Sequence, residues 1–250
     1  MSDFSGASIL ITGAASGIGA ATATLLAESG AKKLILIDRD EVRLRDFGFT
    51  LPCERQVIVG DVCDQSLWAH ADLSGLTHAV VNAGVASASP IVDMPFDEWR
   101  RVLSTNLDAA FLTLQAAMRA MQGNGGAIVL TASVAGIKAE PGIGAYAASK
   151  AALLQLARVA AKEGAGQKIR VNAVAPGGVE TPIWHGLPGF TESVEAHGEE
   201  AAFAAMAGAA TPLGRFAKAE EIAAQIVFLL SDEAASVTGA HLVGDGGYSL

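Results

Sequence analysis

The fold of this chain is decided by residues 8–19, which read Ser8-Ile9-Leu10-Ile11-Thr12-Gly13-Ala14-Ala15-Ser16-Gly17-Ile18-Gly19. The first five residues are mostly apolar, as expected of a strand that is buried on both faces. This strand runs directly into a glycine-rich turn, and a helix is predicted from Gly17 onward. A strand, a glycine-rich turn and a helix in this order begin a parallel βαβ unit.

The same order of elements repeats along the chain, where short apolar runs alternate with longer amphipathic ones. We expect strands at Ser8–Thr12, Lys33–Ile37, Gln56–Val59, Thr77–Val81, Ala127–Thr131, Ile169–Val174 and Ala240–Val243. We expect helices near Gly17–Ser29, Gln65–Ala71, Asp97–Met121, Ala145–Glu163 and Ala219–Leu230. The connections Asp40–Arg55 and Cys63–Leu76 are short, so we expect clipped helices there. This alternation predicts an α/β fold, a parallel sheet with helices on both faces.

The composition is typical of a globular domain. The chain has 250 residues, of which 51% are hydrophobic and 17% are charged, and this balance argues against disorder. No linker or repeat divides the chain, so we expect a single domain over residues 1–250. The formal net charge of −9, without any cluster of Lys or Arg, disfavours a binder of nucleic acid or of anionic membranes.

The cysteines and histidines predict no metal site, because Cys53 and Cys63 lack a CxxC spacing and no HExxH occurs. Two cysteines without such a motif favour a reduced, cytoplasmic protein. The N-terminal residues carry no basic region, so we expect no signal peptide. No apolar run reaches the roughly 18 residues that a membrane-spanning helix needs.

The glycine-rich turn has the context of a dinucleotide-binding loop. Gly13 permits the tight turn, Gly17 lets the backbone approach a pyrophosphate, and Gly19 allows close packing of helix on strand. Ser16 and Ile18 lie at the start of the helix, whose free N–H groups attract phosphate oxygens. The spacing is GxxxGxG rather than GxGxxG, and an ordinary tight turn is the alternative.

The second predicted strand is followed by Asp38 and Arg39. A carboxylate at this place accepts hydrogen bonds from the adenosine ribose and repels a 2′-phosphate, so Asp38 favours NAD over NADP. Arg39 could pair with that phosphate, which leaves the strictness of the preference open. A helix cap is the alternative role for Asp38.

Tyr146 and Lys150 are four residues apart and share one face of a predicted helix. An ammonium about 5 Å from the phenol, at an effective dielectric constant of about 20, stabilises the phenolate by roughly 3 kcal/mol. That corresponds to a lowering of the pKa by about two units, which would make Tyr146 a usable acid and base. Simple packing of a ring beside a lysine is the alternative for the pair taken alone.

With the loop, Asp38, Ser133 and the Tyr146–Lys150 pair in this order, the chain resembles the short-chain dehydrogenase/reductase family over its whole length. The resemblance implies a Rossmann-type, doubly wound sheet of seven parallel strands, and a homotetramer. It implies catalytic roles for Asn106, Ser133, Tyr146 and Lys150, with Asn106 in a proton path. It also implies that the cofactor contacts Asp61, Val62, Asn82, Ala83, Gly84, Pro176, Gly177, Val179 and Thr181 as well as Tyr146 and Lys150.

The resemblance predicts an oxidoreductase that transfers a hydride between NAD(H) and a small secondary alcohol or ketone. A substrate lid is expected near residues 180–211, with Gly186, Gly189 and Gly198 as hinges. Apolar side chains there and nearby suggest an apolar substrate, unless they only pack the lid: Ile137, Ile143, Ile183, Trp184, Leu187, Phe190, Phe203 and Met206. An NADPH-dependent 3-ketoacyl reductase is one alternative, and a catalytically silent nucleotide-sensing protein is another.

Overall fold

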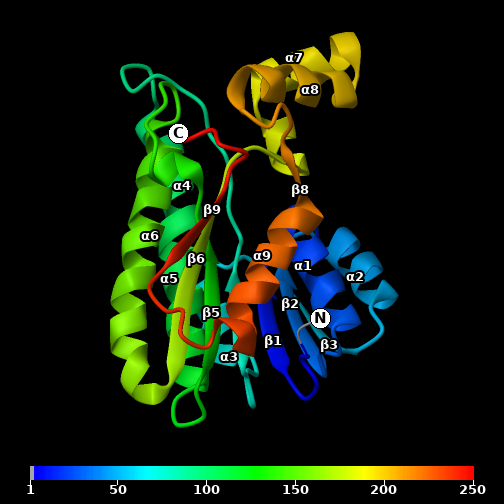
Figure 1. Cartoon of the computed structure of the whole chain (residues 1–250), viewed down its shortest axis with the longest axis vertical. Helices are drawn as coiled ribbons and strands as arrows, with labels where there is room; N and C mark the ends of the chain where they lie inside the picture. The colour runs from blue at the N-terminus through cyan, green and yellow to red at the C-terminus, as the bar shows by residue number, and fades with distance from the viewer. Residues whose placement is uncertain (1–2) are drawn as a thin grey trace.

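Seven strands form one parallel sheet at the centre of the chain (Figure 1). The structure, a computed structural model, describes residues 3–250 apart from the side chains at positions 186, 188 and 209. The strands are β1 (Ser8–Thr12), β2 (Lys33–Asp38), β3 (Glu54–Val59), β4 (His78–Val81), β5 (Gly126–Thr131), β6 (Ile169–Pro176) and β9 (His241–Gly244). Their order is β3-β2-β1-β4-β5-β6-β9, which confirms the predicted Rossmann-type topology.

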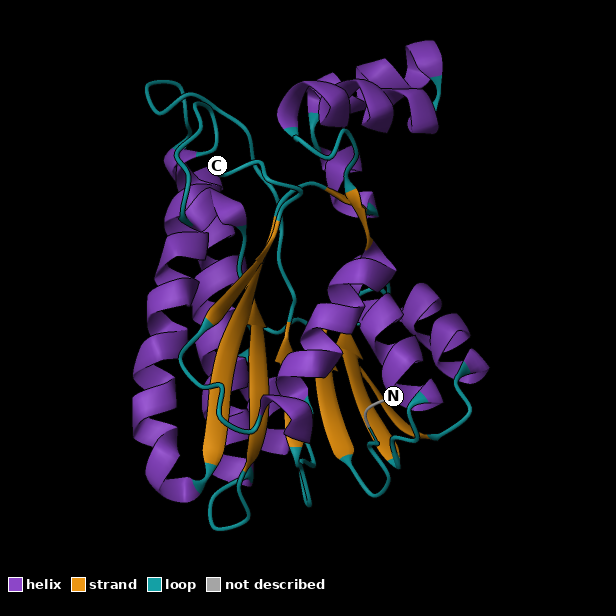
Figure 2. Cartoon of the chain, in the orientation of Figure 1, coloured by secondary structure: helices purple, strands orange, loops and turns teal. Residues whose placement is uncertain are grey.

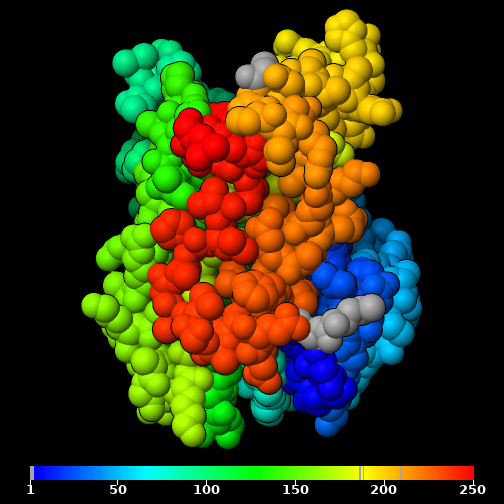
Figure 3. Space-filling model, viewed as in Figure 1, coloured from blue at the N-terminus to red at the C-terminus, as the bar shows by residue number. Residues whose placement is uncertain are grey.

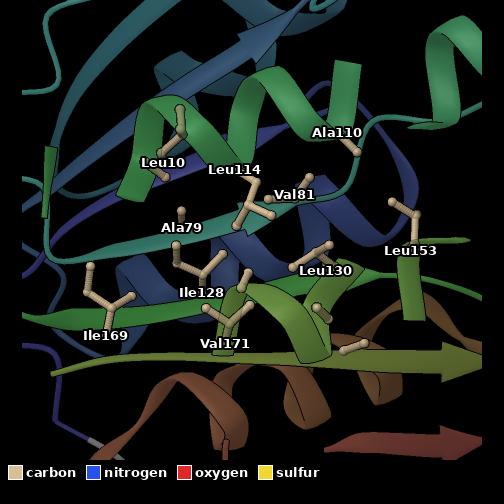
Figure 4. Close-up of a cluster of buried hydrophobic side chains, with 14 of the residues drawn as sticks. Leu10, Ala79, Val81, Ala110, Leu114, Ile128, Leu130, Leu153, Ile169 and Val171 are labelled. Carbon is tan, nitrogen blue, oxygen red and sulfur yellow. The ribbon is translucent and has the colours of Figure 1, made fainter. Parts of the chain in front are cut away.

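The sheet is buried on both faces because successive side chains of each strand point to opposite sides. On β1, Ile9 and Ile11 pack in one cluster, whereas Leu10 packs in the other. Figure 4 shows the cluster around Leu10, with Val81, Leu114, Leu130 and other apolar side chains between sheet and helices. The continuous apolar runs of the strands therefore reflect a sheet with two covered faces.

Helices cover both faces of the sheet, as Figure 2 shows. Their bounds are α1 (Gly17–Glu28), α2 (Glu41–Thr50), α3 (Gln65–His70), α4 (Phe96–Leu103), α5 (Ala109–Ala120), α6 (Gly144–Gly164) and α9 (Ala219–Leu230). Helix α2 is a full ten residues, where a clipped helix was predicted, because Asp40 caps its first turn by accepting from the Arg43 N–H. No helix in residues 3–250 is long and apolar enough to span a membrane.

The predicted long helix Asp97–Met121 is interrupted in its middle. A π-helical segment, η1 (Ser104–Asp108), lies between α4 and α5 and contains the fully buried Asn106. A π-segment is a common means of placing one side chain out of the regular helical register. The predicted helix Asp97–Met121 is thus interrupted at Asn106, where the family resemblance implies a kink.

A helical segment projects beyond one end of the sheet, at the place of the predicted lid, and we refer to it as the lid (Figure 1). It comprises η4 (Pro182–Gly186), α7 (Pro188–His197) and α8 (Glu199–Ala210), and it is joined to the sheet by a short parallel pair, β7 (Val179–Glu180) and β8 (Ala217–Lys218). Gly198, at φ +84°, forms the corner between α7 and α8, in a conformation that favours glycine. Gly189 lies within α7, and the environment of Gly186 lies outside the described part of the chain.

Arg170 on β6 holds the C-terminal end of α9. Its guanidinium donates to the carbonyl oxygens of Leu229 and Leu230 at 2.7 Å, and to that of Ser231 at 2.9 Å. These carbonyls are the ones that a helix leaves without internal partners. The contact therefore ties α9 to the sheet through a charge at the negative end of the helix dipole.

We predict that Arg170→Met lowers the free energy of unfolding by about 2–4 kcal/mol, because several buried carbonyls lose a charged donor. Urea unfolding followed by circular dichroism measures this change. Arg119→Met, which alters an exposed arginine on α5, is the control and should change stability by less than about 0.5 kcal/mol. Equal stability losses in the two variants would contradict the capping role.

Candidate active site

A cavity of about 780 Å³ lies at the carboxyl end of the sheet, beneath the lid. Most of the residues predicted to bind a cofactor or to react line this cavity: Gly13, Ser16, Gly17, Ile18, Asp38, Arg39, Asp61, Val62, Asn82, Ala83, Gly84, Ser133, Tyr146, Lys150, Pro176, Gly177, Val179 and Thr181. Gly19 and Asn106 lie beneath its surface, where they pack against neighbouring backbone. The fold thus brings together segments that are far apart in the sequence.

The glycine-rich turn is packed so tightly that larger residues would not fit. A Cβ on Gly19 would lie 2.0 Å from the carbonyl oxygen of Gly13. Gly13 has φ +65°, and a Cβ there would lie 3.0 Å from the Cα of Ala83. The turn therefore keeps the start of α1 close to the sheet and leaves its backbone open to the cavity, which is the shape that a pyrophosphate requires.

Asp38 stands at the end of β2 beside this turn. Its Oδ2 accepts from the Ala15 N–H, and its Oδ1 accepts from the Asp40 N–H, both at 3.0 Å. An ionised carboxylate has about four acceptor positions, so both oxygens can still accept from ribose hydroxyls. Arg39 also lines the cavity and is exposed. The predicted carboxylate is thus held in place by the turn itself.

Asn82 joins the ends of β4 and β1. Its backbone N–H donates to the Thr12 hydroxyl at 3.0 Å, and its side-chain amide donates to the carbonyls of Thr12 and Gly13 at 3.1 and 3.3 Å. Asp61, after β3, accepts from the Cys63 N–H at 2.9 Å and lines the cavity beside Val62. These contacts fix the loops that form this part of the cavity wall.

Ser133 and Tyr146 meet on the floor of the cavity. Ser133 follows β5, where its hydroxyl donates to the Pro176 carbonyl at 3.4 Å and accepts from the Ala135 N–H at 3.2 Å. Tyr146 lies in the first turn of α6. Burial raises the pKa of Tyr146, and its hydrogen bond with Ser133 offsets only part of that increase in pKa.

The rise in the pKa of Tyr146 is opposite to the sequence prediction, and burial of both Tyr146 and Lys150 explains the difference. Its Nζ donates to the Thr131 carbonyl at 2.7 Å and lies 5.6 Å from the centroid of the Tyr146 ring. Burial lowers the pKa of Lys150 to about 8. The ammonium attracts a phenolate, but both groups lose their hydration in the folded chain, and this loss disfavours both charged forms.

Asn106 supports the site from below. Its Oδ1 accepts from the Val85 N–H at 2.8 Å, and its Nδ2 donates to the Val85 carbonyl and to the Ser149 hydroxyl. Gly84 separates it from Lys150, since a Cβ on Gly84 would lie 3.3 Å from Asn106 Oδ1 and 3.6 Å from Lys150 Nζ. The side chain therefore positions the loop after β4 next to Lys150.

The lid divides its apolar side chains between the cavity and a small core of its own. Ile183, Trp184, Leu187 and Met206 line the cavity, and Ile143 lines it from the other side. Phe190 and Phe203 instead pack with Phe216 in the lid core. Ile137 is 47% exposed to solvent, so the expectation that it faces the substrate is wrong.

Two lining residues, Glu140 and Tyr248, were missed by the sequence reasoning. Glu140 comes from the loop before α6, and Tyr248 comes from the C-terminal segment after β9. No local motif marks either residue, because they meet only through the tertiary fold. The indole of Trp184 was predicted as a lid residue, but its hydrogen bond to the Val179 carbonyl at 2.7 Å was not.

Comparison with known proteins gives consistent matches. Residues 13–249 match the family model described as Enoyl-(Acyl carrier protein) reductase. A cis-4-hydroxycyclohexanecarboxylate dehydrogenase of Sinomonas cyclohexanicum is 39% identical, covering 96% of this chain and 95% of the relative. A 3-oxoacyl-(acyl-carrier-protein) reductase of Thermotoga maritima is 35% identical over 95% of this chain and 96% of its own.

A solved structure has the same fold. The crystal structure of a short-chain type dehydrogenase/reductase from Mycobacterium marinum superposes with a TM-score of 0.85 at 34% identity, over 99% of this chain and 97% of that one. The chain therefore belongs to the short-chain dehydrogenase/reductase family, a family of oxidoreductases that use nicotinamide cofactors.

We predict that Tyr146→Phe abolishes turnover, by at least about 10³-fold, because it keeps the ring and removes the group that exchanges a proton. Binding of the dinucleotide should persist within a few-fold, as measured by fluorescence titration with NADH. Tyr248→Phe is the matched control and should keep most of the activity toward a simple alcohol. Near wild-type turnover in the Tyr146 variant would rule out its role as acid and base.

Proposed function

We propose that this chain is an NAD-dependent alcohol dehydrogenase and ketone reductase that acts on a small secondary alcohol with an apolar body. The observation that carries the proposal is the meeting of Ser133, Tyr146 and Lys150 in one cavity with the glycine-rich turn and the Asp38 carboxylate. One end of this cavity has the shape and polarity for a dinucleotide. The other end is covered by the apolar side of the lid.

The residues present fit a nicotinamide dinucleotide. The turn from Gly13 to Gly19 would hold the pyrophosphate, Asp38 the adenosine ribose, and Asp61 and Val62 the adenine. Val179 and Thr181 would contact the nicotinamide carboxamide, and Lys150 its ribose. When bound, the cofactor supplies a carbon that takes up or gives back a hydride.

The protein's part in the reaction is to hold the substrate oxygen and to move its proton. The Ser133 hydroxyl would bind that oxygen and stabilise charge that develops on it. Tyr146 would take the hydroxyl proton during oxidation and return it during reduction. Lys150 would favour the phenolate while it remains protonated, below a pH of about 8. Asn106 would hold the loop beside Lys150, and a path for the proton to solvent would pass near it.

An alicyclic substrate body suits the walls of the cavity. Trp184, Leu187 and Met206 from the lid and Ile143 from the loop before α6 present apolar surface. Two relatives have names that point to six-membered rings, the hydroxycyclohexanecarboxylate dehydrogenase and a 2,5-dichloro-2,5-cyclohexadiene-1,4-diol dehydrogenase of Sphingobium indicum. A cyclic secondary alcohol is therefore the substrate class that we favour.

A ketoacyl reductase is the nearest alternative, and the Thermotoga maritima relative favours it. Such an enzyme must bind a phosphate-bearing carrier, yet residues 180–211 contain neither Lys nor Arg. Asp38 also opposes the 2′-phosphate of NADPH. A silent nucleotide-sensing protein is less well supported, because Asn106, Ser133, Tyr146 and Lys150 are all present.

We also propose a cytoplasmic homotetramer of single-domain subunits. Ala109, Ala110 and Ala117 of α5 are buried in the subunit's own core, so these residues do not form an interface. Phe111 on α5 is 46% exposed, and Ala151 on α6 is exposed. These side chains leave an apolar surface that a second copy could cover. Sedimentation as a monomer would contradict this assembly.

We predict that Asp38→Asn raises the ratio of kcat/KM with NADP to that with NAD by about tenfold or more. The amide keeps the shape of Asp38 and its place beside the turn but removes the charge that repels a 2′-phosphate. Steady-state kinetics with both cofactors measures the ratio. Asp46→Asn, an exposed change on α2, is the matched control and should leave the ratio unchanged. A wild-type enzyme that prefers NADP would overturn the assignment of NAD.

We predict that NADH forms when the protein is incubated with NAD and cyclohexanol or another cyclic secondary alcohol. The same preparation should reduce acetoacetyl thioesters with NADPH at least about tenfold less efficiently, since the lid offers no cation for a carrier. Absorbance at the nicotinamide band follows both reactions. The opposite order of efficiencies would favour the ketoacyl reductase, and no turnover of any alcohol would favour the silent protein.

A further inference from the structure

A pair of polar residues, Glu140 and Tyr248, lines the cavity but has no part in the proposed proton transfer. Both side chains are half-buried and belong to the same cavity as Ser133 and Tyr146. The apolar side chains of Ile143, Leu187 and Met206 line the same cavity. A polar pair in such surroundings is well placed to recognise a second functional group on a substrate.

The C-terminal segment that carries Tyr248 is held by several contacts. The Asp245 carboxylate accepts from the N–H groups of Gly247 and Ser249, at 2.9 and 2.8 Å. Lys138 Nζ donates to the Tyr248 carbonyl at 2.8 Å and lies 4.0 Å from the centroid of its ring. In Figure 3 this segment, in red, lies between the green part of the chain and the orange part of the lid region. Tyr248 is therefore a fixed part of the cavity wall.

The charges around the pair favour a neutral hydrogen-bonding group. Lys138 Nζ lies 3.6 Å from Glu140 Oε1 and balances its charge. Burial and the hydrogen bond with Glu140 raise the pKa of Tyr248 to about 12, so its hydroxyl stays protonated. The Glu140 carboxylate keeps acceptor positions beyond these two contacts, because it has about four in total. The pair can therefore accept a hydrogen bond from a substrate hydroxyl.

Arg101, another basic residue that lines the cavity, already has an acidic partner. Arg101 donates from Nε and Nη2 to the two oxygens of Glu98, at 2.7 Å each, and from Nη2 to the Ala86 carbonyl at 3.3 Å. A substrate carboxylate would thus meet Glu140 and a paired arginine, and it would lose its hydration without gaining a free cation. The charges disfavour an anionic substrate.

We propose that Glu140 and Tyr248 form a hydroxyl-binding subsite, so that the substrate is a neutral cyclic diol whose second hydroxyl bonds to this pair. This inference rests on the proposed alcohol dehydrogenase function. Two residues outside the reacting centre then decide whether the enzyme prefers a mono-alcohol, a diol or a hydroxy acid as its substrate. Glu140 and Tyr248 are thus residues that determine specificity.

The test compares kcat/KM with NAD for cyclohexanol, for the 1,2-, 1,3- and 1,4-cyclohexanediols, and for 4-hydroxycyclohexanecarboxylate. In the wild type, at least one diol should exceed cyclohexanol by about tenfold or more, as expected for a hydrogen bond to a charged group, and the hydroxy acid should be the poorest. Tyr248→Phe and Glu140→Ala should each remove most of the preference for the diol. Both variants should leave kcat/KM for cyclohexanol within a few-fold.

Glu140→Gln keeps the shape of the side chain and removes its charge, so it should raise kcat/KM for the hydroxy acid while it lowers that for the diol. Glu163→Gln, an exposed change on α6, is the matched control and should alter neither value. Cyclohexanol turnover reports folding and tests the proposed function separately. If cyclohexanol is oxidised but the wild type prefers the hydroxy acid, or if the variants affect diol and cyclohexanol equally, the subsite is refuted and the dehydrogenase function stands. If none of these alcohols is oxidised, both proposals fail.

Discussion

The parallel register of the sheet is the constraint on which the whole site depends. Thr12 pairs with Ile37, Val81 with Leu130, and Thr131 with Val174, so the strands end at nearly the same level. Each strand is followed at once by a short polar or glycine-containing segment. Because parallel strands all point the same way, these segments gather at one edge, although they are spread over most of the chain. Because the sheet is buried on both faces, its strands must be apolar throughout. Packing of these apolar side chains on the helices stabilises the register.

The same burial that builds the sheet also sets the electrostatics of the reacting groups. Lys150 donates a hydrogen bond to the Thr131 carbonyl at the end of β5, and its ammonium is buried away from water. Its pKa of about 8 places its titration near neutral pH rather than far above it. Desolvation disfavours both the Lys150 ammonium and a Tyr146 phenolate, whereas their mutual attraction favours them. A charge that a ligand brings close would therefore shift the pKa values of both groups. Gly84 and Asn106 matter here because they set how closely the neighbouring loop approaches Lys150.

Local patterns in the sequence predicted the features that local physics decides. The parallel sheet with two covered faces follows from the alternation of apolar runs with amphipathic ones, and the roles of Gly13 and Gly19 follow from what a Cβ would strike. A kink at Asn106 is implied by the family resemblance, but its π-helical form was not predicted, because its partners Val85 and Ser149 are distant in sequence. The direction of the pKa of Tyr146 was missed for a similar reason, since burial is a property of the folded chain. The membership of the family, by contrast, followed from motifs that are specific only in combination.

The lid and the C-terminal segment show how substrate choice can be separated from chemistry in this fold. Phe190, Phe203 and Phe216 give the lid a core of its own, on which the cavity-lining side chains Trp184, Leu187 and Met206 also pack. Trp184 stacks on Phe216 at 5.4 Å and also bonds to the Val179 carbonyl, which couples the lid to the loop after β6. Lys138 does the same for the C-terminal segment, by joining Tyr248 to the loop before α6. The residues that line the substrate end are therefore held by the lid and the C-terminal segment rather than by the sheet. Changes among them can leave Ser133 after β5 and Tyr146 and Lys150 on α6 in their positions.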